Sequence, residues 1–92
     1  MQLVLPQLIV GDTENVNITL ECEDFAQLYE TLQEKYPDYL TSIFNENRTL
    51  KKGVFLVMDG QIVKKYQVER LTFTQSDVLE VLVQLLGNEK DL

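Results

Sequence analysis

The sequence of 92 residues contains no histidine and no tryptophan, and only one cysteine, two prolines and four glycines. Without histidine, the chain lacks the usual general base of enzymes and the commonest metal ligand. It also shows no glycine-rich phosphate loop, no catalytic triad and no recognisable pair of catalytic carboxylates. We therefore expect no catalytic residue, no metal site and no bound cofactor. We interpret the chain as a carrier or binding protein rather than a self-sufficient enzyme.

The single cysteine, Cys22, cannot form an internal disulfide, which suits a reducing cytoplasm. Its neighbours Glu21, Glu23 and Asp24 are spaced poorly for an oxygen cage around a cation, so we interpret them as a strand end and a helix cap. The chain lacks the run of about 18 apolar residues that suggests a membrane span. It also begins without a recognisable signal peptide. We expect a cytoplasmic protein.

Basic residues are also scarce, with eight Lys and Arg against 15 Asp and Glu, for a net charge of −7. This balance argues against nucleic acid and against an anionic membrane as partners. An acidic small domain instead suits a partner protein with a basic docking face. Arg48, Lys51 and Lys52 form one basic patch, which Lys64 and Lys65 follow. We interpret it as a solvated loop, with a phosphate or an acidic partner as the alternative.

The first half of the chain predicts two strands and a helix. Residues 2–10 are β-prone, and Pro6 marks an edge, a bulge or a strand end. Residues 16–22 alternate between apolar and polar side chains, which predicts a half-buried strand that forms a hairpin with the first. Asp24 is a good N-cap for an amphipathic helix of about three turns. That helix should stop at Tyr36, because a residue before proline avoids the α region.

The middle of the chain predicts a short helix, a loop and a second hairpin. Residues 37–44 can start a helix with a proline in its first turn, and residues 45–53 form the longest polar stretch. Residues 54–58 and 61–66 flank Asp59-Gly60, a pair typical of a type I′ turn with positive φ at both positions. We expect these two segments to pair as antiparallel strands.

The most apolar run, residues 74–88, allows two interpretations. Ser76 could cap a helix that ends at Gly87. Alternatively the run is a strand with Leu79, Val81, Val83 and Leu85 on one face, and with Leu82 outside this pattern. Periodicity alone does not separate the two, and the leucine content favours a helix slightly. We favour a central strand buried on both faces.

With that strand, the order of elements is β-β-α-β-β-β. This order predicts an α+β fold, the ubiquitin-like β-grasp, in which a mixed sheet packs on one main helix. We expect Phe44 and Phe55 to lie in its core. Residues 1–87 should form the single domain and residues 88–92 a flexible C-terminal tail.

Four stretches of the chain together resemble one known family. They are the strand pair before Asp24, the helix that ends in Lys35-Tyr36-Pro37, the hairpin around Asp59-Gly60, and the apolar run that ends in Gln84-Leu85-Leu86-Gly87-Asn88. The sequence thereby resembles the MoaD/ThiS family of sulfur carriers over nearly its whole length. In that family the C-terminal glycine carboxylate is adenylated by an activating enzyme, which uses ATP, and becomes a thiocarboxylate that donates sulfur.

The resemblance implies roles for the residues at the C-terminal end. Gly87 and Asn88 would form the carrier tail, while Leu85 and Leu86 would contact the partner, an adenylating enzyme or a sulfur-transfer protein. The sequence departs from the family where Asn88 replaces the last glycine and residues 89–92 extend beyond it. Three explanations remain open: trimming of the tail to Gly87, a non-catalytic interaction module that has lost the carrier chemistry, or a shared fold only.

Overall fold

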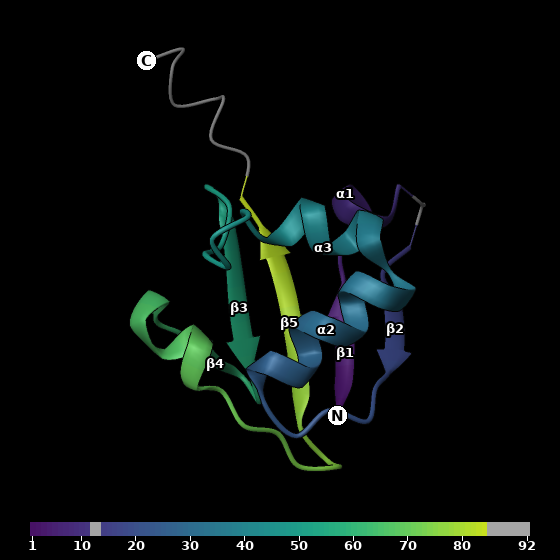
Figure 1. The fold of residues 1–92 in the computed structure, drawn as a ribbon. Helices are drawn as coiled ribbons and strands as arrows, with labels where there is room; N and C mark the ends of the chain where they lie inside the picture. The colour runs from purple at the N-terminus through teal and green to yellow at the C-terminus, as the bar shows by residue number, and fades with distance from the viewer. Residues whose placement is uncertain (12–13, 85–92) are drawn as a thin grey trace.

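The computed structural model describes residues 1–11 and 14–84, which form a five-stranded sheet with helices on one face (Figure 1). The strands are β1 (Gln2–Leu5), β2 (Val16–Thr19), β3 (Val54–Met58), β4 (Gln61–Val63) and β5 (Val78–Val83), arranged in the order β2-β1-β5-β3-β4. The helices are α1 (Gln7–Val10), α2 (Phe25–Lys35), α3 (Pro37–Ile43) and the 3₁₀ helix η1 (Lys65–Arg70). The predicted α+β fold is confirmed.

The C-terminal strand β5 lies at the centre of the sheet. It pairs in parallel with β1, where Leu79 stands opposite Leu3, and antiparallel with β3, where Val81 stands opposite Leu56. The strand interpretation of the apolar run is therefore confirmed, and the helix alternative is wrong. The expected boundary between the domain and its tail, after residue 87, lies outside the described residues.

The core lies between the inner face of the sheet and the helices α2 and α3 (Figure 1). Alternate residues of the strands point into it, as the period of two requires. The buried apolar residues of the strands and helices are Leu3, Leu5, Phe25, Leu28, Leu32, Leu40, Ile43, Val54, Leu56, Val63, Val68, Leu79 and Val81. Phe44 is also buried and packs edge-on against Phe25 with 5.5 Å between ring centroids, so its predicted place in the core is confirmed.

The helix α2 forms as the sequence predicts. The Asp24 side chain accepts a hydrogen bond from the backbone N–H of Gln27 at 2.9 Å, which satisfies one free donor of the first turn. The helix ends at Lys35, one residue before Tyr36, and Pro37 then starts α3 as expected. Asp24 is thus a helix cap, as interpreted from its position.

Three predicted strands are shorter than expected. The strand predicted over residues 16–22 ends at Thr19, where the chain turns towards the Asp24 cap of α2. Residues 7–10 form the single turn α1, because the chain bends at Pro6 and closes the turn with the N–H of Gly11 bonded to the carbonyl of Gln7. On the other side of the molecule β4 ends at Val63, and η1 follows. The chain leaves the sheet there and buries Val68, which is 3% exposed, in the core.

The second hairpin has the predicted turn. Asp59 and Gly60 have φ values of 48° and 86°, the left-handed conformation that this turn requires. Asp59 also connects the hairpin to the start of β5: its N–H donates to the carbonyl of Val78, and its Oδ1 accepts from the N–H of Val78, both at 2.9 Å.

The carboxylate of Asp77, just before β5, should make the free energy of unfolding depend on pH. The backbone N–H of Thr74 donates to Asp77 Oδ2 at 2.8 Å, and this bond to the ionised carboxylate lowers the pKa of Asp77 below its ordinary 3.8. The unfolded chain therefore binds this proton more readily than the folded protein. Asp77 adds stability above about pH 4, and the gain is lost as the pH falls through the lower pKa of the folded state.

We expect Asp77→Asn to be less stable than the wild type near neutral pH, with the two curves converging in acid. Denaturant titrations at a series of pH values measure this directly. A difference that stayed constant down to the lowest pH would show that the charge of Asp77 contributes nothing.

Candidate functional site

The face of the sheet opposite the helices carries an apolar surface. Phe55, Ile62 and Leu82 are 39%, 69% and 44% exposed, and Val57 is half-buried between them. We call these four residues the outer patch. Among the described residues, the helices α2 and α3 pack against the inner face of the sheet, so the outer patch faces away from them (Figure 1).

The strand register makes the outer patch continuous across three strands. Phe55 on β3 stands directly opposite Leu82 on β5, and Val57 on β3 stands directly opposite Ile62 on β4. Directly opposed side chains of antiparallel strands have Cβ atoms about 5 Å apart and so contact one another. The half-buried Glu80, opposite Val57 on β5, places one carboxylate beside the patch.

Two predictions about this face were wrong. Phe55 was expected in the core, and β5 was expected to be buried on both faces, yet Phe55 and Leu82 are exposed. The reason is the single layer of helices: with Leu56 and Val81 turned towards it, the neighbouring positions must face the other way. The position of Leu82 outside the predicted alternation was the feature of the sequence that could have indicated this surface.

The described part of the chain ends beside the outer patch. The N–H of Gln84 donates to the carbonyl of Gly53 at 2.7 Å, which holds the end of β5 against the start of β3. Gln84 follows Leu82 by two residues. The predicted tail and contact residues (Leu85, Leu86, Gly87 and Asn88) lie outside the described residues, and they continue the chain from this corner of the sheet.

Three other features considered in the sequence are the cysteine, possible metal ligands and possible membrane spans. Cys22 is buried, with its Sγ 3.5 Å from Thr31 Oγ1. No group of three or more His, Cys, Asp or Glu side chains that could hold a metal ion occurs in residues 1–11 and 14–84. Over the same residues, no helix combines the length and the hydropathy that crossing a membrane requires.

Several solved structures are similar to this chain. The solution structure of the HVO 2177 protein of Haloferax volcanii has 15% identity and a TM-score of 0.61, and the match covers 95% of this chain and 86% of that one. For one crystal structure of SAMP1 of the same organism the values are 11% identity, a TM-score of 0.61, and coverage of 95% and 99%. A second crystal structure, of the small archaeal modifier protein 1 of H. volcanii, has 11% identity, a TM-score of 0.57, and coverage of 91% and 98%. For Urm1 of Sulfolobus solfataricus the values are 18%, 0.61, and 91% and 100%.

No protein-family model matches the sequence, and no curated protein matches it. The structural matches, by contrast, cover more than nine tenths of the chain and agree with the observed element order and mixed sheet. At these identities it is the fold that the comparisons establish. The chain has the ubiquitin-like β-grasp fold, as its resemblance to the sulfur carriers implied.

Proposed function

We propose that the protein is a ubiquitin-like, sulfur-carrier-like protein that docks on an adenylating or sulfur-transfer enzyme. In this function the outer patch binds the partner, and the tail that contains Gly87 enters the partner's active site. The partner would use ATP to adenylate the exposed carboxylate, which turns a carboxylate oxygen into part of a leaving group that sulfur can replace. Leu85 and Leu86 would line the entrance to the site.

The observation that supports this proposal is the position of the outer patch beside the end of β5. Contiguous exposed apolar side chains mark interaction surfaces in soluble proteins. A partner that covers Phe55 and Leu82 also covers the corner at Gln84, from which the tail continues. One docked enzyme could therefore hold the domain and receive its tail. The name of SAMP1, a modifier protein of the same fold, is consistent with such a role.

The glycine at position 87 suits this role for a steric reason. A residue without Cβ passes through a narrow channel and brings its backbone close to a nucleotide. Trimming after Gly87 would give that residue the free carboxylate that the chemistry needs. The resemblance to the sulfur carriers provides the assignment, and Gly87 is the residue of this chain that matches their motif.

The alternative function is a non-catalytic interaction module that binds its partner through the outer patch alone. A specific observation favours it: Asn88 occupies the position of the family's last glycine, and residues 89–92 follow. In this case the tail stays intact, and no carboxylate is activated.

Intact-mass spectrometry of the protein from its native host distinguishes the two functions. For a carrier we expect chains that end at Gly87, and a fraction whose mass increase equals the replacement of one carboxylate oxygen by sulfur. A Gly87→Val variant should lose the sulfur-bearing fraction, because its side chain obstructs entry to the partner's channel. If only the untrimmed, unmodified chain is found, both with ample sulfur and under sulfur limitation, the carrier function is excluded.

A further inference from the structure

The charge of this acidic protein is distributed unevenly. Residues 48–70 contain six of the eight Lys and Arg residues and only two acids, for a net charge of +4, whereas the rest of the chain contains two basic and 13 acidic residues, for −11. The sequence separates these cations into a loop before β3 and a segment after β4. A positively charged surface attracts anionic groups locally, even on a protein whose net charge is negative.

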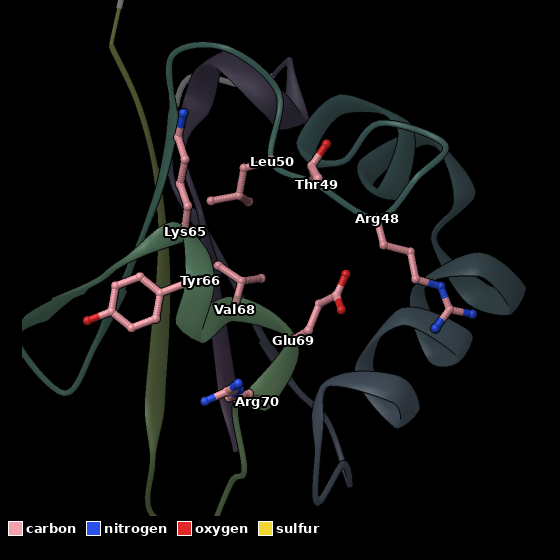
Figure 2. A pocket seen from close by; sticks show the side chains of 8 residues that line it. All are labelled: Arg48, Thr49, Leu50, Lys65, Tyr66, Val68, Glu69 and Arg70. Carbon is pink, nitrogen blue, oxygen red and sulfur yellow. The ribbon is translucent and has the colours of Figure 1, made fainter.

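The fold brings the two basic segments together around a hollow. It lies between the loop of residues 48–50 and η1 and has a volume of about 660 Å³. The residues that line it are Arg48, Thr49, Leu50, Lys65, Tyr66, Val68, Glu69 and Arg70 (Figure 2). Three of these carry a positive charge and one a negative charge, so the net charge of the lining is +2.

The hollow combines an apolar base with a charged rim. Val68 is buried and Leu50 half-buried, so the base of the hollow is formed by the edge of the core. Tyr66 also lines the hollow and is 68% exposed, and Figure 2 shows its ring pointing away from Leu50 and Val68. The Arg48 guanidinium carbon lies 4.7 Å from the centre of the Tyr29 ring, a cation–π contact that anchors this side chain against α2.

The charged groups do not converge on one point. Figure 2 shows the Lys65 ammonium, the Arg48 guanidinium and the Arg70 guanidinium pointing to different sides of the hollow, with the Glu69 carboxylate between them. A single phosphate would need donors that meet at one anion. Cations spread around an apolar base instead match a chain that carries several carboxylates and an apolar side chain.

We propose that this hollow binds an extended acidic segment of a partner protein. Carboxylates of the segment lie against Lys65, Arg70 and Arg48, and an apolar side chain packs on Leu50 and Val68. The site lies between η1 and the loop before β3 and shares no residue with the outer patch. The inference is therefore independent of the proposed carrier function, and it holds equally for an interaction module.

The probe for this site is a short synthetic peptide of glutamate and aspartate around a single leucine, labelled with a fluorophore. We expect saturable binding to the full chain, with NMR shift changes grouped at residues 48–50 and 65–70. Raising the ionic strength well above 0.1 M, where the screening length is about 10 Å, should weaken the binding. A peptide with glutamine and asparagine in place of the acids should not bind.

Matched variants test the charge arrangement. Arg70→Gln should weaken peptide binding about fivefold, and Glu69→Gln should strengthen it about twofold, as expected for exposed ion pairs. Lys35→Gln, which removes the same charge at the end of α2, should change the affinity much less. Arg48 is not substituted, because its guanidinium packs on the Tyr29 ring and its loss would also remove a contact within the fold.

Several outcomes would overturn the proposal. One is equal weakening by Arg70→Gln and Lys35→Gln, which would indicate a general charge effect. Another is grouping of the NMR shift changes on the outer patch. Tighter binding of tripolyphosphate or of an RNA oligonucleotide, measured by competition with the labelled peptide, would assign the hollow to phosphates instead. Loss of the carrier modification in the host would leave the peptide result unchanged, so the two hypotheses fail separately.

Discussion

Leu79→Ala is expected to lower the free energy of unfolding by about 3 kcal/mol, a typical cost of removing a fully buried leucine side chain. Leu79 is 0% exposed and stands in the central strand between Leu3 on β1 and Met58 on β3. The surrounding side chains belong to three strands and to the helices, so they cannot all move to fill the cavity. A small domain has about 5–15 kcal/mol of stability in total, so this loss is a large part of it.

Leu82→Ala is the matched control, because it removes the same atoms from the same strand on its other face. Leu82 is 44% exposed, and its truncation should cost about 1 kcal/mol or less. Urea denaturation of the two variants measures the difference. Equal losses, or a larger loss at Leu82, would contradict the register, because a shift by one residue exchanges the two faces of a strand.

Leu82→Asp is expected to reduce the trimmed or sulfur-bearing fraction of the chain in its native host at least about tenfold, if the proposed carrier function is correct. A carboxylate at the centre of an apolar interface loses its hydration without gaining a partner. Leu82 lies beside Phe55 and two residues before Gln84, so the charge would enter the contact next to the tail. Intact-mass spectrometry of the variant and the wild type gives the ratio.

The control for this experiment is Thr19→Asp, which adds the same charge to the same face at the β2 edge of the sheet. It should leave the modified fraction within about twofold of the wild type, since β1 separates β2 from the strands that carry the outer patch. Thermal unfolding of both variants should show an intact fold, because both positions are partly exposed. An unchanged modified fraction in Leu82→Asp would remove the outer patch from the proposed function.

Much of the fold was predictable because its elements depend on neighbours in the sequence. The cap at Asp24, the end of α2 before Pro37 and the turn at Asp59-Gly60 all occur where the sequence places them. Each is decided by backbone conformation and hydrogen bonds within a few residues. The final strand was harder to predict, because an apolar run of this length fits a helix equally well until its pairing partners are known.

The errors share a physical cause. Residues 61–66 were predicted to return from the Asp59-Gly60 turn as one strand, but β4 ends at Val63 so that Val68 can reach the core. Phe55 has the hydrophobicity of a core residue, and its neighbours Val54 and Leu56 occupy the core instead. In both cases the competing contacts come from residues distant in the chain, and they outweigh the local preference.

For the candidate sites, the sequence alone located the two groups of cations, and its prediction of the tail residues falls outside the described residues. It determined by itself the helix cap, the tight turn, the alternation of the strands and the acidic charge balance, all of which follow from the identity of adjacent residues. Only the tertiary structure decided which face of β5 remains open, where the chain leaves the sheet, and that Arg48 and Arg70 line one hollow. These features depend on contacts between residues far apart in the chain, and such contacts exist only once the sheet has assembled around β5.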